Sequence, residues 1–152
     1  MKKIITLLSA TLLISLFSFS QKMPADKIPA AVKQSFIKMF PSATAVKYGS
    51  ENKDYEVGFI NKGAEMSANF NAKGKWLETE TVIRPEDLPK AVADSVERNF
   101  PGYSIANVGK VEKPGKEFVY EMDLKKDKEG LEVEISAKGR ILKKMPWKEE
   151  KD

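Results

Sequence analysis

The sequence reads IPAAVKQSFIKMFP at residues 28–41 and LPKAVADSVERNFP at residues 88–101. These two stretches align without a gap, sixty residues apart. Further along the chain the offset becomes sixty-five, and two more pairs match: Tyr55-Glu56-Val57 with Tyr120-Glu121-Met122, and Ala72-Lys73-Gly74 with Ala137-Lys138-Gly139. A unit that recurs at a fixed period is one supersecondary structure that packs on its own copy. We therefore predict two tandem repeats of one fold.

Each repeat begins with an amphipathic helix, because apolar residues recur there every three or four positions with charged residues on the other side. Pro29 and Pro89 lie in the first turns, where a missing N–H removes no hydrogen bond, and a second proline ends each helix. Asp26 and Asp87 are predicted N-caps. The apolar stripes consist of Ile28, Ala31, Val32, Ser35, Phe36, Met39 and Phe40 in the first repeat, and of Leu88, Val92, Val96 and Phe100 in the second.

After each helix the hydrophobic period falls from about 3.6 to 2, which is typical of half-buried antiparallel strands. The fold class is α+β: two tandem repeats, each one helix followed by a four-stranded antiparallel sheet, packed as one body because no flexible linker joins them. The pattern leaves open whether the two sheets merge. The expected segments are a signal peptide at 1–20, the first repeat at 21–83, the second repeat at 84–147 and a charged tail at 148–152.

Residues 1–20 have the features of a secretory signal: two lysines, then an apolar run at 4–19, then small residues at Ser18 and Ser20. That run is about 16 residues, shorter than the roughly 20 that a membrane-spanning helix needs. We expect cleavage before Gln21 and no membrane span in the mature chain. The chain has no cysteine, which excludes a lipid anchor on cysteine and any disulfide. The mature protein is therefore expected in the periplasm.

The chain resembles the PepSY-like, β-lactamase-inhibitor-protein-like secreted domains of Bacteroidetes-type bacteria. The resemblance rests on Ile28-Pro29 and Leu88-Pro89, on Phe40-Pro41 and Phe100-Pro101, on the two Tyr-Glu strands and on Ala-Lys-Gly before each final strand. It covers essentially the whole mature chain and implies a tandem helix-plus-sheet fold, a periplasmic location and non-catalytic binding. The family offers no agreed catalytic residues to carry over, and inhibition of β-lactamase itself does not follow.

The composition argues against an enzyme. The chain has no histidine and no cysteine, so it lacks the commonest general base, the commonest zinc ligand and any thiol nucleophile. Ser35 and Ser95 lie on apolar stripes, where a small residue allows close approach to the sheet. The net charge of +4 is too small an excess for a nucleic-acid-binding protein, which would gather its basic residues on one face.

Strand alternation predicts an acidic face on the side of the sheet away from the helices. If the aromatic and aliphatic residues face the helices, the other side carries Glu56, Glu65, Glu78, Glu80, Glu121, Asp123, Glu132 and Glu134, with Trp76 alongside. Two interpretations stay open at this point. The face is either a solvated surface, partly offset by Lys75, Lys116, Lys125 and Lys143, or a platform for a basic protein or peptide that Trp76 or Tyr48 anchors.

Calcium is a further alternative, because carboxylates on neighbouring strands or in the loop from Asp123 to Glu129 are ligands that this ion prefers. No EF-hand pattern is present, and lysines interrupt the loop acids. We therefore expect no cofactor. The expected function is that of a non-catalytic periplasmic protein that binds an unidentified protein or peptide, and more specifically one that inhibits or modulates a hydrolase. The alternative is a calcium-binding or calcium-responsive envelope protein.

Overall fold

A computed structural model describes residues 22–51 and 53–146. The predicted signal peptide, the charged tail and Trp147 lie outside the described residues. Within them, none of the helices has the length and apolar character needed to cross a membrane.

Two ten-residue helices stand in the predicted places: α1 spans Ala30–Met39 and α2 spans Lys90–Asn99. A short 3₁₀ turn precedes each of them, η1 at Ala25–Lys27 and η2 at Pro85–Asp87. The N-cap positions belong to Pro29 and Pro89, and no side chain caps either helix. The prediction that Asp26 and Asp87 are N-caps was therefore wrong, because these residues lie in the 3₁₀ turns.

The eight strands form one antiparallel sheet in the order of the sequence. Their bounds are β1 Thr44–Glu51, β2 Asp54–Asn61, β3 Ala64–Phe70, β4 Trp76–Val82, β5 Ser104–Glu112, β6 Val119–Lys126, β7 Glu129–Ser136 and β8 Ile141–Pro146. The last strand of the first repeat pairs with the first strand of the second, with registers from Thr79↔Glu112 to Val82↔Gly109. The four-stranded sheets predicted for the two repeats, whose merging the sequence left open, are thus joined in a single eight-stranded sheet.

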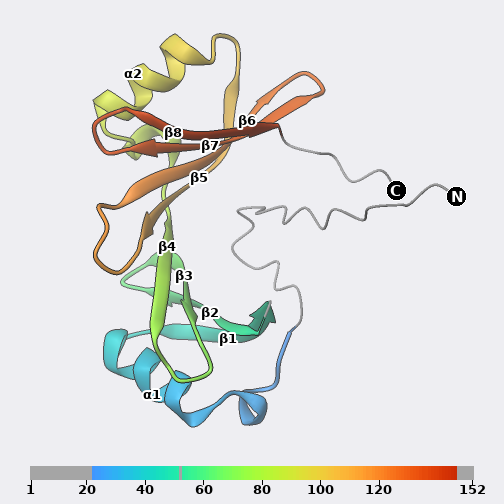
Figure 1. Cartoon of the computed structure of the whole chain (residues 1–152), viewed down its shortest axis with the longest axis vertical. Coiled ribbons are helices and arrows are strands. Elements are labelled where there is room, and N and C mark those ends of the chain that lie inside the picture. Colours follow the sequence, from blue (N-terminus) through green and yellow to red (C-terminus); the bar gives the residue numbers. More distant parts are fainter. Residues whose placement is uncertain (1–21, 52, 147–152) are drawn as a thin grey trace, which may run out of the picture.

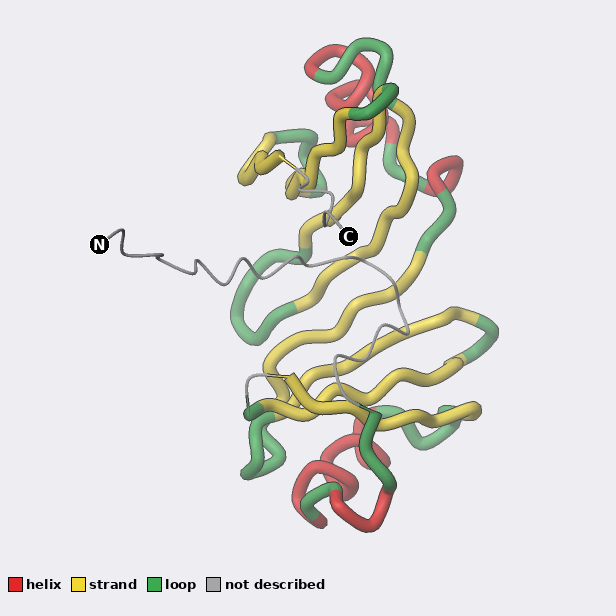
Figure 2. Tube along the Cα trace, turned by 90° about the vertical axis from the view of Figure 1, so that its right-hand side faces the viewer, coloured by secondary structure: helices red, strands yellow, loops and turns green. Residues whose placement is uncertain are grey.

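Both helices cover the same face of this sheet, one over each half. Figure 1 shows the sheet bending between its two ends, with α2 above one end and α1 below the other, and Figure 2 shows the helices at opposite ends of the strand layer. The face without helices therefore lies on the inside of the bend.

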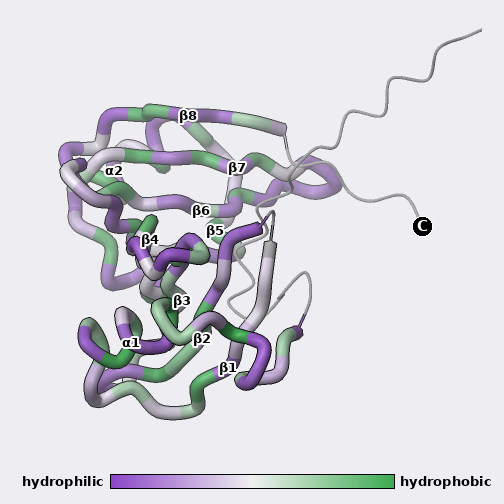
Figure 3. The backbone as a smooth tube through the Cα atoms, turned by 60° about the horizontal axis from the view of Figure 1, so that its bottom comes forward, coloured by the Kyte–Doolittle hydropathy of each residue, from purple (hydrophilic) through white to green (hydrophobic). Residues whose placement is uncertain are grey.

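Each helix closes its own hydrophobic core. The first core contains Ile28, Val32, Phe36, Val57, Phe59, Ala68 and Phe70. The second contains Leu88, Val92, Val96, Phe100, Val108, Tyr120, Met122, Leu124, Val133 and Ile135. Figure 3 shows the hydrophilic and hydrophobic positions alternating along the strands, as half-buried strands require. Most apolar residues of the predicted helix stripes are buried, while Ala31, Ser35 and Phe40 are partly buried. Met39 is exposed, and Phe40 packs against Phe36 and Phe59.

The repeated Ala-Lys-Gly motif is explained by the contact between a hairpin turn and a helix. Gly74 and Gly139 have φ of +75° and +80°, a left-handed conformation that favours glycine. A Cβ atom at either position would collide with a helix carbonyl, that of Ala31 or Ala91. Ser35 Oγ would be 2.9 Å from such an atom at Gly74. The small residue predicted at this helix position is therefore needed for close packing.

Candidate functional site

The register of the strands brings the predicted acids onto the helix-free side of the sheet. Glu121 lies between Gly109 and Glu134, and Asp123 is paired with Glu132. Glu56 is linked to Glu78 through Asn69, which pairs with both across three neighbouring strands. We call this surface the acidic face; it consists of Glu56, Glu65, Glu78, Glu80, Glu121, Asp123, Glu132 and Glu134.

Polar partners from the same face hold several of these carboxylates. Lys113 Nζ lies 3.2 Å from Glu78 and 3.9 Å from Glu121. Lys143 Nζ lies 3.1 Å from Glu132, so this lysine offsets part of the negative charge of the face, as the sequence suggested. Sequence reasoning missed Lys113, because it follows the last residue of β5 and has no place in a strand pattern.

Two asparagines also bind carboxylates of the acidic face. Asn69 Nδ2 donates to Glu78 Oε1 at 3.0 Å, and Asn107 Nδ2 donates to Asp123 Oδ2 at 3.2 Å. Both asparagines belong to the alternating positions on the same side as the acids, so the strand register could have revealed them.

Glu80 differs from the other acids because one oxygen of its carboxyl group is enclosed without a hydrogen-bond partner among the described residues. The side chain lies over Gly109, where a Cβ atom would collide with Oε1. Among the described residues, Oε1 is enclosed and has no hydrogen-bond partner, although the residue as a whole is partly exposed. Burial, together with the charges of Glu121, Glu78, Glu56 and Asp123, raises the pKa of Glu80 to about 8. At neutral pH this carboxyl is therefore mainly protonated.

Two further acids of the face, Glu121 and Asp123, are buried, which disfavours their charged forms. Burial raises the pKa of Glu121, an effect that Lys113 opposes and the charge of Glu134 reinforces. Burial also raises the pKa of Asp123, which is only 3% exposed, against the hydrogen bond from Asn107. Carboxylates placed directly opposite one another in a sheet repel, so the fold maintains this arrangement at a cost in stability.

The expected position of Trp76 beside the acids was wrong. Trp76 pairs with Phe70 while Glu78 pairs with Asn69, so Leu77 is an extra residue in β4. This β-bulge turns Trp76 to the opposite face, where it packs against the first core and its Nε1 donates to Thr79 Oγ1 at 2.9 Å. Tyr48, the other proposed anchor, also packs against that core. Neither aromatic residue lies on the acidic face.

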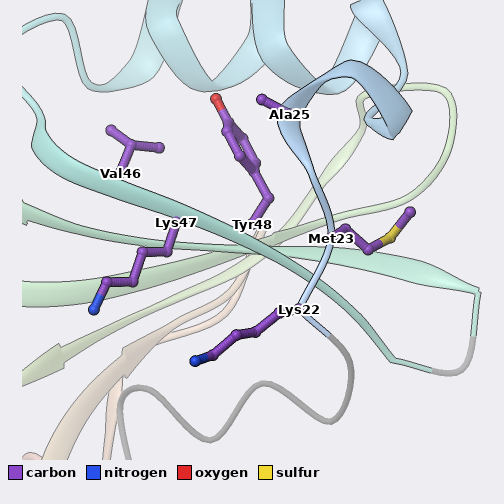
Figure 4. Close-up of a pocket in the computed structure, with 6 residues that line it drawn as sticks. All are labelled: Lys22, Met23, Ala25, Val46, Lys47 and Tyr48. Atoms are coloured by element: carbon purple, nitrogen blue, oxygen red, sulfur yellow. The ribbon is translucent and has the colours of Figure 1, made fainter.

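Tyr48 instead lines a cavity of about 400 Å³ at the edge of the sheet, together with Lys22, Met23, Ala25, Val46 and Lys47. Figure 4 shows the Tyr48 ring pointing away from Lys47, on the side of the 3₁₀ turn and helix. Lys22 forms an isolated bridge with Gly49, so this short segment covers part of the outer edge of β1. The described residues that line this cavity include no carboxylate.

We expect Trp76→Phe to lower the free energy of unfolding by about 1 kcal/mol, because Thr79, which is 3% exposed, loses a hydrogen-bond donor. Chemical denaturation would measure this loss. A variant as stable as the wild type, but with weaker binding of a basic peptide, would contradict the assignment of Trp76 to the core.

The described residues contain no group of three or more acidic, histidine or cysteine side chains that could hold a metal ion. The arrangement is instead an open surface of carboxylates that are partly paired and partly desolvated. Such a surface can attract and orient cationic groups.

Comparison with known proteins gives one family and several similar structures. The family model described as "Putative beta-lactamase-inhibitor-like, PepSY-like" matches residues 18–68 and 53–143. No curated protein matches the chain.

Three crystal structures of Bacteroides proteins have a TM-score of 0.74 to this chain. A BLIP-like protein of Bacteroides fragilis is 22% identical, and the alignment covers 86% of this chain and 92% of that one. A DUF2874 family protein of Bacteroides ovatus is 23% identical, with coverage of 78% and 86%. The third, from Bacteroides eggerthii and described as "putative periplasmic proteins", is 20% identical, with coverage of 78% and 88%. At these identities the similarity shows a shared fold.

Proposed function

Since the chain belongs to the PepSY-like, beta-lactamase-inhibitor-like family, we propose that it is a non-catalytic periplasmic binding protein that binds a basic protein or peptide through the acidic face. One observation carries this proposal: eight carboxyl-bearing residues share the face of the sheet that neither helix covers. Complementary charge of this kind steers association and selects partners. The sheet provides a fixed backbone on which the carboxylates keep their spacing.

The non-catalytic role is supported by the absence of histidine and cysteine from the sequence. The periplasmic location is supported by the signal-like N-terminus and by the description of the Bacteroides eggerthii structure. More specifically, we propose that the partner is a hydrolase that this protein inhibits or modulates. The inhibitor-like description of the family supports this more specific proposal without identifying the enzyme.

We expect the double variant Glu132→Lys/Glu134→Lys to bind a basic peptide about tenfold more weakly than the wild type at low salt. Each reversal replaces an attraction of roughly 0.3–0.4 kcal/mol by a repulsion of similar size, so the two reversals together cost about 1.4 kcal/mol, which is tenfold in affinity. Isothermal titration calorimetry with deca-lysine would measure the change, and circular dichroism would check folding, because Glu132 also loses its bond to Lys143.

The matched control is Glu86→Lys/Glu97→Lys, which makes the same change of net charge beside α2. Both residues are exposed, and α2 covers the opposite side of the sheet from the acidic face. If the two double variants weakened binding equally, net charge alone would explain the attraction and the acidic face would have no special role.

Calcium binding is the alternative expected from the sequence. Its test is a melting curve with millimolar calcium against one with chelator. A clear rise of the melting temperature with calcium would support that alternative.

A further inference from the structure

Glu80 occupies the centre of the acidic face, at the seam where the two repeats join. Its strand β4 pairs on one side with β3, which places Ser67 opposite Glu80, and on the other side with β5, which places Val111 opposite it. The neighbouring positions on both strands are thus uncharged, and Gly109 leaves the space in which the carboxyl group lies.

Among the described residues, the charged groups that raise the pKa of Glu80 are all acids. Glu78 comes from β4 itself, Glu56 from β2, and Glu121 and Asp123 from β6. Two basic residues of the face are paired with other acids: Lys113 with Glu78 and Glu121, and Lys143 with Glu132 on β7. Lys47 of β1 is in register with Glu80 across the sheet, through Gly58 and Ser67, and lies three strands away.

The acidic face therefore has at its centre a carboxyl group that is surrounded by other acids. Its Oε1 atom is enclosed and unpartnered among the described residues. Burial and the surrounding negative charges raise the pKa of Glu80 to about 8, so the free protein carries a proton there at neutral pH.

We propose, on the basis of the binding function above, that Glu80 couples binding to pH: a lysine or arginine side chain of the partner docks beside the Glu80 carboxyl group and displaces the Glu80 proton. The O–H bond of the carboxylic acid breaks, the carboxylate pairs with the incoming cation, and the proton passes to the solvent buffer. The partner cation keeps its own protons throughout, since the side-chain pKa of lysine is about 10.4 and that of arginine is higher.

This coupling fixes the direction of the pH dependence. Because binding releases a proton, rising pH favours the complex, with an affinity gain of up to about tenfold per pH unit while free Glu80 is protonated. Above about pH 8 free Glu80 has already lost its proton, and the affinity levels off.

The test uses deca-lysine as the probe and isothermal titration calorimetry at pH 6, 7, 8 and 9. At each pH the titration is made in two buffers of different ionisation enthalpy and equal ionic strength, so that the difference in heat gives the number of protons released. For the wild type we expect about one proton per complex at pH 7 and little release at pH 9. Glu80→Gln should bind with no proton release and with a flat pH profile.

Glu65→Gln is the matched control, because it removes one carboxylate from the same face at a position outside the group around Glu80. It should bind somewhat more weakly at every pH and release the same proton as the wild type. Proton release that persists in Glu80→Gln, or that is absent in the wild type while deca-lysine binds, would overturn the inference and leave the binding function in place. Failure of the wild type to bind deca-lysine at any of these pH values would overturn both.

Discussion

Glu80→Gln is expected to be more stable than the wild type by about 2–4 kcal/mol at pH 7, and equally stable near pH 4. The pKa of this carboxyl rises from 4.5 to about 8 in the folded protein. The folded state therefore holds a proton that the unfolded state has lost, and the wild type loses stability as pH rises from about 4.5 to about 8. Glutamine has nearly the same shape and no charge to desolvate, so the variant avoids this loss.

Guanidinium denaturation at pH 4, 5.5, 7 and 8.5 would measure the difference between the two proteins. The gain should grow with pH by somewhat more than 1 kcal/mol per unit and then level off above pH 8. Glu65→Gln, at a position of the same face outside this group, is the matched control and should show no comparable growth. Parallel stability curves for wild type and Glu80→Gln would refute the protonated state of Glu80.

Gly109→Ala tests the same carboxyl without changing any charge. The new Cβ atom would collide with Glu80 Oε1, which sits at the end of a flexible side chain and can swing towards solvent. The displaced carboxyl regains its hydration, so its contribution to the pH dependence of stability should shrink. A pH dependence identical to that of the wild type would mean that Gly109 does not give Glu80 its buried position.

Periodicity predicted the elements of this fold well, because helix and strand patterns are local. The stripes that begin at Ile28 and Leu88 became α1 and α2, and the alternating segments became strands. The merging of the sheets depends on pairing between β4 and β5, which lie on either side of η2 and α2. No local signal in the sequence reports that pairing, so the topology needed the structure.

The acidic face was also predictable, since its residues alternate with core residues, but Trp76 was not. A single extra residue, Leu77, turns the preceding Trp76 to the opposite side of the sheet. The second repeat contains the same irregularity at Leu142, between Ile141 and Lys143. The burial of Glu80 was equally hidden, because it depends on Gly109 in a strand of the other repeat.

The second large effect is expected at the turns that touch the helices: Gly74→Ala and Gly139→Ala should each lower the free energy of unfolding by about 2–5 kcal/mol. A left-handed backbone costs an L-residue roughly 1–2 kcal/mol, and forcing an atom into a packed contact costs roughly 1–3 kcal/mol more. Both terms apply, since each glycine has positive φ and faces a helix carbonyl.

Gly63→Ala separates the two terms. Gly63 has φ of +82°, but a Cβ atom there would meet nothing within 4 Å. This variant should lose only the roughly 1–2 kcal/mol of the left-handed conformation. Chemical denaturation of the three variants would measure the difference, and equal losses at all three positions would show that the turns do not pack closely on the helices.

The same variants test whether the repeats unfold together. In a Trp147→Phe background, Trp76 is the remaining tryptophan and reports on the first core, where it packs. Because β4 and β5 pair within one sheet, we expect Gly139→Ala in the second repeat to shift the Trp76 fluorescence transition as far as the circular dichroism transition. A Trp76 transition that stays at its original denaturant concentration would mean that the seam between β4 and β5 does not couple the two halves.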